Sequence, residues 1–435
     1  MTDSVNTREL VLEMLLEINE KGQYSHLILR DVLNKYQYLS KQERSFLTRV
    51  TEGTLEHLIE LDYILNSFSK TKVSKMKPFI RNLLRMSVYQ IKYMDGVPDS
   101  AVCNEAVKLA KKHGFSQLSG FVNGVLRNVA RNLETIKYPD QKKEPVRFLS
   151  VTFSMPEWIV EQWVAEYGFR KTKTICEGFF EEGALTIRTN LSKTTPQQLL
   201  KMLEKEQVKV EAVEGLSYAF RISDYDYLNA LEAFEQGLFY VQDISSMMVA
   251  EAADVKENQY VIDVCAAPGG KSTHLAEKLN GTGMVEARDL TDYKVSMIEE
   301  NIARHELSNM KAVCMDATVY DEESCGKADV LICDLPCSGL GVLGKKTDIR
   351  YKMSKEQQQE LVKLQRRILD TVHAYVKPGG ILLYSTCTIH KGENEDNIAW
   401  FLQKHPEFSL EKQRQMFPGE VGNDGFYLAK LIRNR

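Results

Sequence analysis

The sequence lacks several features that would assign it to other protein classes. No uninterrupted apolar run approaches the ~18 residues of a transmembrane helix, and the first residues, MTDSVNTREL, show no basic and apolar secretory signal. There is no C-x-x-C pair and no histidine pair at zinc spacing, so we expect no metal site. No repeat or low-complexity tract is present. We therefore expect a cytoplasmic globular protein of about three domains, with its eight cysteines reduced and, by default, buried.

The net charge of −4 hides an uneven distribution of charged residues along the chain. Residues 71–150 contain 15 Lys and Arg against 6 Asp and Glu, whereas residues 1–70 contain 8 against 11. The basic stretch is either a solvated helix face or an anion-binding surface for nucleic-acid phosphates.

Hydrophobic periodicity divides the chain into three parts. The first 135 or so residues show helical spacing and no strand-like alternation, which predicts a helix bundle over 1–140. Residues 146–238 alternate short strand candidates such as ALTIRTN, VKVEAV and YAFRIS with helical segments, which predicts a small α/β module. Residues 239–435 alternate strand, turn and helix, which predicts an open, mostly parallel sheet with helices on both faces.

The predicted sheet carries its strands at 260–265, 284–289, 311–316, 329–334 and 381–387. A helix over 354–376 is expected to begin with a capping box of Ser354 and Gln357 and to end at the turn Lys377-Pro378-Gly379-Gly380. Ligands of such sheets bind beyond the carboxyl ends of the strands.

A loop of small residues follows the first of these strands, in YVIDVCAAPGGKSTHLAEKL. Ala266, Ala267, Gly269 and Gly270 allow a ligand to approach the backbone closely. The loop matches neither G-x-G-x-x-G nor the nucleotide triphosphate loop, so neither a dinucleotide nor a nucleoside triphosphate is the expected ligand.

Three successive expected strands of this part end in aspartates, which are Asp289, Asp316 and Asp334. Asp289 lies near the ~20-residue offset of carboxylates that bind ribose hydroxyls. A single aspartate at such a place is more often a turn former, but three at one sheet edge favour a ligand site. A nucleoside with an uncharged linkage and a cationic end, such as S-adenosylmethionine, has the matching character.

Two thiols follow neighbouring strands, in DLPCSG at Cys337 and in STCT at Cys387. A thiolate is a strong nucleophile. Addition of a thiolate to C6 of a pyrimidine makes C5 nucleophilic enough to attack a sulfonium methyl group. Each cysteine taken alone would more often be a buried structural thiol.

The motifs DVCAAPGGKS, DLPCSG and YSTCT, in this order, resemble the Sun/RsmB/Nop family of RNA cytosine-5 methyltransferases. RNLLRMSVYQIKYMDGVPDSAVCNEAVKLAKK and SGFVNGVLRN are similar to the RNA-binding NusB fold. A NusB-like domain before the catalytic domain is the arrangement of the family members that act on 16S ribosomal RNA. The resemblance implies a small RNA-recognition-like module at 146–238 and a Rossmann-like class I methyltransferase domain at 239–435.

The resemblance also implies roles for individual residues. Cys387 is the expected nucleophile on C6, Cys337 is expected to assist release, and Asp334 is expected to face the cofactor and the pyrimidine N3. Asp289 and Asp316 are expected beside the ribose and the adenine. The expected S-adenosylmethionine loop comprises Cys265, Ala266, Ala267, Pro268, Gly269, Gly270 and Lys271.

Several alternatives remain open at this stage. Lys345, Lys346, Arg350 and Lys352 either clamp substrate phosphates or form a solvated loop. The enzyme could instead act on transfer RNA or another ribosomal position, or the chain could be a non-catalytic RNA-binding factor. We expect 16S ribosomal RNA, before its assembly into the subunit, as the partner of a monomeric protein, with no membrane partner.

Overall fold

A computed structural model describes residues 5–181, 184–420 and 423–435, so the first four residues of the N-terminal stretch considered above lie outside it. The chain forms two compact units. The first comprises residues 1–177 and 343–352, and the second comprises residues 178–342 and 353–435. Each unit is described by itself.

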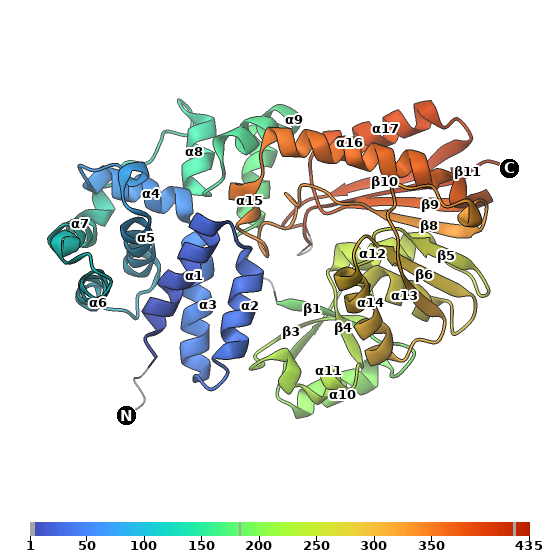
Figure 1. Ribbon diagram of the computed structural model, residues 1–435, viewed down its shortest axis with the longest axis horizontal. Helices are drawn as coiled ribbons and strands as arrows, with labels where there is room; N and C mark the ends of the chain where they lie inside the picture. Colours follow the sequence, from blue (N-terminus) through green and yellow to red (C-terminus); the bar gives the residue numbers. More distant parts are fainter. Residues whose placement is uncertain (1–4, 182–183, 421–422) are drawn as a thin grey trace. The chain divides into compact units, whose positions relative to one another are not determined.

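The first unit is built of helices (Figure 1). Local sequence signals define several of their ends: Asn6 caps the first helix, and Ser40 and Glu43 form a capping box on the third. Side chains such as Leu15, Ile64 and Leu84 are fully buried in one hydrophobic core. The helices are α1 (Thr7–Lys21), α2 (Ser25–Lys35), α3 (Lys41–Glu56), α4 (Leu58–Phe68), α5 (Pro78–Tyr93), α6 (Asp99–Lys112), α7 (Ser119–Asn132), α8 (Pro145–Thr152), α9 (Glu157–Gly178) and α15 (Ile349–Lys352).

The second unit begins with a small antiparallel sheet in the order β2-β3-β1-β4. The helix α10 (Pro196–Lys205), capped by a box of Thr195 and Gln198, covers this sheet. A short helix α11 (Glu232–Glu235) precedes the last strand. The strands are β1 (Leu185–Thr189), β2 (Lys209–Ala212), β3 (Ala219–Ser223) and β4 (Phe239–Val241). The small α/β module predicted from the sequence is confirmed.

The second unit also contains a seven-stranded sheet in the order β10-β11-β9-β8-β5-β6-β7. The strands β9, β8, β5, β6 and β7 are parallel, and β10 and β11 form an antiparallel edge. The mostly parallel sheet expected from the sequence is confirmed. The strands are β5 (Tyr260–Asp263), β6 (Met284–Asp289), β7 (Met310–Cys314), β8 (Ala328–Asp334), β9 (Val376–Thr386), β10 (Phe408–Met416) and β11 (Phe426–Arg433).

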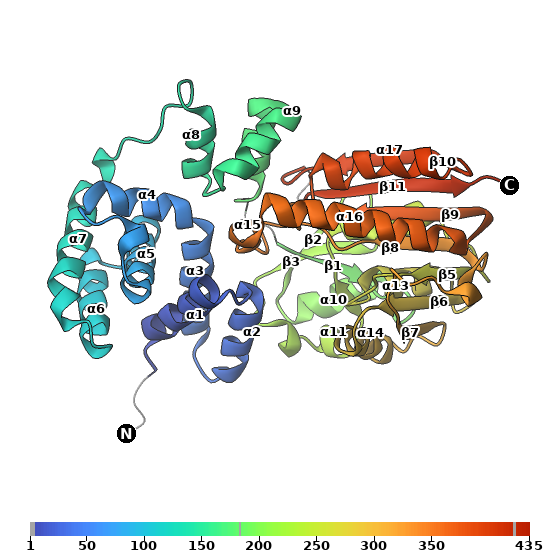
Figure 2. The same cartoon turned by 45° about the horizontal axis from the view of Figure 1, so that its top comes forward.

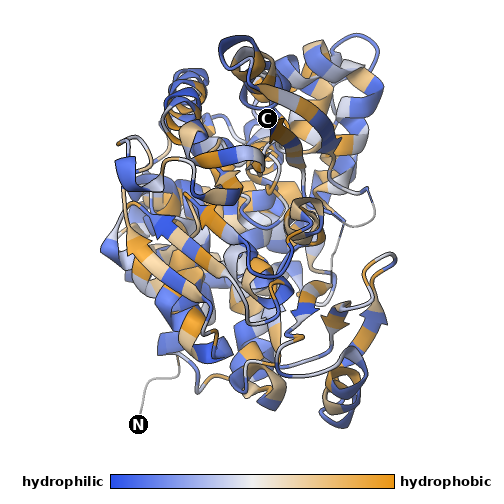
Figure 3. Cartoon of the chain, turned by 90° about the vertical axis from the view of Figure 1, so that its right-hand side faces the viewer, coloured by the Kyte–Doolittle hydropathy of each residue, from blue (hydrophilic) through white to orange (hydrophobic). Residues whose placement is uncertain are grey.

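Helices cover both faces of this sheet because successive residues of its buried strands point to opposite faces (Figure 2). Val261 and Val330 pack with α12 (Ile244–Ala253), α13 (Gly270–Lys278) and α14 (Asp292–His305). The neighbouring Ile262 and Leu331 pack with α16 (Lys355–Val372) and α17 (Glu395–Lys404). The helices carry hydrophilic and hydrophobic residues in turn along the ribbon (Figure 3), as half-buried helices do.

Two local expectations need correction. The expected capping box of Ser354 and Gln357 is present, but α16 ends at Val372 and the turn expected to end it lies inside β9. Cys314 and Cys325 are exposed rather than buried. No helix among the described residues is long and apolar enough to cross a membrane.

Candidate active site

The candidate site lies at the carboxyl ends of the parallel strands. β5 lies between β8 and β6 in the sheet, and the chain continues from β5 to β6 on one side and later to β8 on the other. A sheet opens a crevice beyond its strands where the strand order reverses in this way. The carboxyl ends of β5, β6, β7, β8 and β9, with the segments that follow them, carry the residues selected from the sequence.

The small-residue loop after β5 is bound to the end of β6. The N–H of Ala267 donates to Asp289 Oδ2 at 2.9 Å. Gly269 has a φ of +107°, a left-handed conformation that favours glycine, and it leads into α13. Cys265 is half-buried, and burial raises the pKa of its thiol, which suits a residue that contributes backbone rather than thiol chemistry.

Asp289 is almost completely buried at the end of β6. Besides Ala267, its carboxylate accepts hydrogen bonds from the N–H of Leu290 at 2.8 Å and from Lys294 Nζ at 2.9 Å. It therefore already orders the loop after β5 in the protein alone. Asp316 lies two residues beyond β7 and accepts from the N–H and Oγ1 of Thr318, which lowers the pKa of its carboxyl.

Lys271 and Asp334 form an ion pair between α13 and the end of β8. Lys271 Nζ lies 2.8 Å from Asp334 Oδ2, and the Ser385 hydroxyl donates to Asp334 Oδ1 at 2.6 Å. Burial alone would lower the pKa of Lys271, but the negative charge of Asp334 raises it above the ordinary value. Lys271 is therefore charged at neutral pH and has a position inside the site rather than on the solvated side of its helix.

The two thiols selected from the sequence lie side by side. Cys337 Sγ is 3.2 Å from Cys387 Sγ, and both residues are half-buried thiols rather than a disulfide. The hydrogen bond with Cys387 and burial raise the pKa of Cys337 well above its usual value. Cys337 therefore keeps its proton at neutral pH and can donate it toward the sulfur of Cys387.

A buried carboxylate that the sequence reasoning missed holds the loop of Cys337. Glu393 is fully buried, and it accepts hydrogen bonds from the Ser338 N–H at 2.9 Å and the Ser338 hydroxyl at 2.6 Å. Gln365 Nε2 adds a bond at 3.0 Å. The hydroxyls of Ser338 and Thr388 lie 2.8 Å apart, so the residues that follow the two cysteines also contact each other.

Two glycines bring the loops after β8 and β9 together with the start of β11. The Gly341 N–H donates to the Cys387 carbonyl at 3.0 Å, and the Gly425 N–H donates to the Gly341 carbonyl at 2.8 Å. A Cβ atom on Gly341 would lie 1.9 Å from the Gly425 carbonyl oxygen. Only glycine fits at position 341 without movement of this loop.

Asp263 is a second carboxylate that the sequence reasoning missed. It ends β5, is buried, and accepts from the Ser272 hydroxyl at 2.5 Å. Burial raises the pKa of Asp263 to about 7. A carboxylate at the end of a strand was a usable signal, because the same signal selected Asp289 and Asp334.

The basic segment after the Cys337 loop belongs to the first unit. Arg350 is fully buried, and its guanidinium donates to the carbonyls of Leu343, Thr347 and Phe153 at 3.1–3.2 Å. Lys352 pairs with Asp348. Neither the phosphate clamp nor the solvated loop is correct for Arg350, which holds a turn of the first unit together.

Comparison with protein families covers the three parts of the chain. Residues 250–432 match the family 16S rRNA methyltransferase RsmB/F. Residues 5–131 match the NusB family, and residues 155–226 match the ferredoxin-like domain of RsmF/B-like methyltransferases. The NusB-like and methyltransferase parts predicted from the sequence are confirmed, and the middle module is of the ferredoxin-like type.

Individual relatives match over almost their full length. The probable ribosomal RNA small subunit methyltransferase B of Bacillus subtilis (strain 168) is 37% identical, with 98% of each chain covered. The ribosomal RNA small subunit methyltransferase B of Cronobacter sakazakii is 29% identical, with 100% of each chain covered. The crystal structure of PH0851 superposes with a TM-score of 0.83 at 25% identity, covering 98% of this chain and 99% of that one. The chain belongs to the RsmB/F family of 16S rRNA methyltransferases.

Proposed function

We propose that this protein methylates C5 of a cytosine in 16S ribosomal RNA, with S-adenosylmethionine as the methyl donor and Cys387 as the nucleophile. The observation that carries the proposal is the pair of thiols 3.2 Å apart at the carboxyl edge of the sheet, beside the ion pair of Lys271 and Asp334. Family membership supports the reaction class and the RNA substrate.

The residues around the loop after β5 fit the proposed cofactor. S-adenosylmethionine, when bound, supplies an electrophilic methyl group on a cationic sulfur. The site offers carboxylates at Asp289, Asp316 and Asp334, which match a cationic ligand that carries ribose hydroxyls. We assign the main-chain groups of the expected loop to the same ligand. These residues are Cys265, Ala266, Ala267, Pro268, Gly269, Gly270 and Lys271.

In the proposed mechanism Cys387 adds as a thiolate to C6, which forms an S–C6 bond and moves the C5=C6 electron pair to C5. Asp334 faces N3 of the pyrimidine, and its carboxylate, which also pairs with Lys271, holds a proton that N3 takes up from solvent as negative charge develops on the ring and gives back when the adduct breaks down. After methylation the C5 proton leaves to a base, the double bond forms again, and the S–C6 bond breaks. Cys337 keeps its proton and stabilises the departing Cys387 thiolate by a hydrogen bond.

The assignment of the two cysteines is tested by substituting each to alanine. We expect Cys387→Ala to abolish both methyl transfer and covalent trapping of 16S ribosomal RNA. We expect Cys337→Ala to accumulate a covalent protein–RNA adduct, visible as a shifted band on a denaturing gel. Cys325→Ala, at an exposed cysteine, is the matched control and keeps wild-type behaviour. Wild-type turnover by Cys387→Ala would reject the mechanism.

The burial of the two thiols limits which form of RNA can be the substrate. A base must leave its stack to contact a half-buried thiol at a sheet edge. We therefore propose single-stranded or loosely structured RNA, such as unassembled 16S ribosomal RNA, as the substrate. The test compares initial rates on free RNA and on assembled small subunits, and faster methylation of the assembled subunit would contradict the proposal. We also propose the cytoplasm as its location, because the proposed substrate is ribosomal RNA.

The helical unit supplies cations that suit RNA phosphates. Part of the basic stretch is neutralised within the unit, because Arg81 pairs with Glu20 and Arg85 pairs with Asp62. Lys72 and other cations of this stretch remain exposed on the surface. The proposed RNA affinity should therefore fall with salt concentration.

A further inference from the structure

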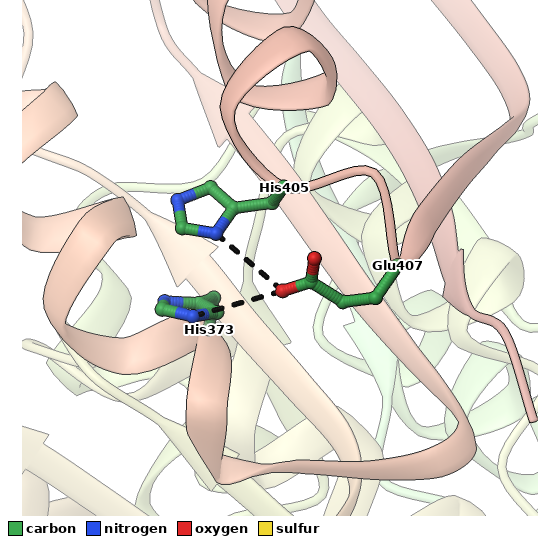
Figure 4. A group of neighbouring side chains, drawn as sticks. All are labelled: His373, His405 and Glu407. Atoms are coloured by element: carbon green, nitrogen blue, oxygen red, sulfur yellow. Dashed lines mark ion pairs between the residues drawn. The ribbon is translucent and has the colours of Figure 1, made fainter.

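Three side chains from separate elements converge at the other end of the large sheet. His373 begins the turn after α16, His405 follows the last residue of α17, and Glu407 precedes β10. His405 Nδ1 lies 3.5 Å and His373 Nε2 lies 3.8 Å from the same oxygen, Glu407 Oε1 (Figure 4). The three potential ligand atoms all lie within 4.8 Å of one another.

Asp370 determines which nitrogen of each ring carries a proton. His373 Nδ1 lies 2.8 Å from the carbonyl oxygen of Asp370, and His405 Nε2 lies 3.2 Å from Asp370 Oδ1. Both partners are hydrogen-bond acceptors, so both of these nitrogens must be the protonated ones. The remaining nitrogens, His373 Nε2 and His405 Nδ1, then direct their lone pairs at Glu407.

Two lone pairs that face a carboxylate repel it unless a cation lies between them. A carboxylate or carbonyl that accepts the far N–H of a ligating histidine is the usual support of a metal site. The ammonium group of Lys404 does not fill this position, because it forms an ion pair with Asp370 at 2.7 Å rather than with Glu407.

We propose that His373, His405 and Glu407 bind a zinc-type divalent cation, with Asp370 as the outer support and water in the fourth position. Two imidazole nitrogens and one carboxylate oxygen are a donor set that zinc accepts. Tetrahedral coordination at zinc distances separates neighbouring ligand atoms by about 3.4 Å. The two distances to Glu407 are already close to that value. The side chain of Glu407 is 38% exposed, so an ion can enter from solvent.

The metal would have a structural role rather than a catalytic one. The site lies at the start of β9, whereas Cys387 follows its end, and the strand, which pairs with Ala328–Asp334 of β8, separates them by roughly 20 Å. The ligands join the ends of α16 and α17 to the edge strand β10. The bound ion would therefore hold two helices and an exposed sheet edge together, independently of the proposed methyl transfer.

The test is titration of the full-length protein with Co²⁺ and Zn²⁺ alone. The Cys337→Ser/Cys387→Ser variant serves as background, because two thiols 3.2 Å apart would themselves bind zinc. We expect one equivalent of Co²⁺ with a tetrahedral visible spectrum and no thiolate charge-transfer band. Zn²⁺ should displace it and raise the unfolding temperature.

Substitutions locate the ion. Glu407→Gln keeps the shape of an exposed side chain and should weaken Zn²⁺ binding at least tenfold, whereas Glu411→Gln, within the strand that follows, should not. Asp370→Asn should weaken binding about 10–100-fold through His405 alone, because His373 contacts the main-chain carbonyl of Asp370. His405→Gln provides a second ligand variant.

Three results would overturn the proposal. They are no uptake of Zn²⁺, equal uptake by the Glu407→Gln variant, or a thiolate charge-transfer band. The competing arrangement is a doubly protonated His405 held between Asp370 and Glu407, and it predicts the first of these.

Discussion

Glu393 offers a strict test of how the candidate active site is held. Its carboxylate accepts two hydrogen bonds from Ser338, the residue after Cys337, and one from Gln365. Hydrogen bonds to a charged group contribute about 1.5–3 kcal/mol each. The two bonds to Ser338 are therefore worth at least about 3 kcal/mol, which corresponds to roughly a hundredfold in the population of the ordered loop. Glu393→Ala should displace Cys337 from Cys387 without changing either thiol.

The assay is the covalent adduct with 16S ribosomal RNA, measured beside turnover. If Cys337 acts in release, Glu393→Ala should accumulate the adduct as Cys337→Ala does, with slower product release. Glu393→Gln retains one acceptor oxygen and should restore most of the turnover. Glu360→Ala, at an exposed glutamate on α16, controls for the loss of a carboxylate. Wild-type release by Glu393→Ala, with no adduct, would refute the argument that Glu393 positions the thiol.

Two further predictions concern stability and packing. Glu60 is buried beside Lys92, and despite burial its partners lower its pKa to about 2. The contribution of ionised Glu60 to the free energy of unfolding is therefore present above the unfolded pKa of about 4.3. This contribution is lost as pH falls from about 5 toward 2. Urea unfolding of Glu60→Gln should show a loss of about 3 kcal/mol at pH 7 and a flatter pH profile across that window; identical profiles would contradict the pKa shift. Gly341→Ala should displace the loop from the Gly425 carbonyl, reduce the free energy of unfolding by about 1–3 kcal/mol and lower turnover. Gly124→Ala, where an added Cβ atom would meet open space, should reduce neither the free energy of unfolding nor turnover.

The parts that the sequence predicted are those with local signals. The five parallel strands have hydrophobic runs, β5, β6 and β8 end in aspartates, and the expected strand at 284–289 matches β6 residue for residue. Strand β10 gives no such signal, because its middle residues are polar and exposed, as an edge strand tolerates. Arg350 could not be placed from sequence either, because its partners include the Phe153 carbonyl, 197 positions earlier in the chain.

The position of the two thiols shows the same difference, within the site, between what local sequence signals predict and what depends on contacts between distant residues. The sheet pairs Asp334 with Ser385, so Cys337 and Cys387 follow paired residues by three positions and two positions. Neighbouring parallel strands alone therefore predict that the two cysteines lie near each other. Direct contact between the sulfurs depends on Glu393, on the hydroxyls of Ser338 and Thr388, and on the close approach of Gly341 to Gly425. These contacts join three separate segments, after β8, after β9 and before β11, so no single motif contains them, and this explains why Glu393 was missed.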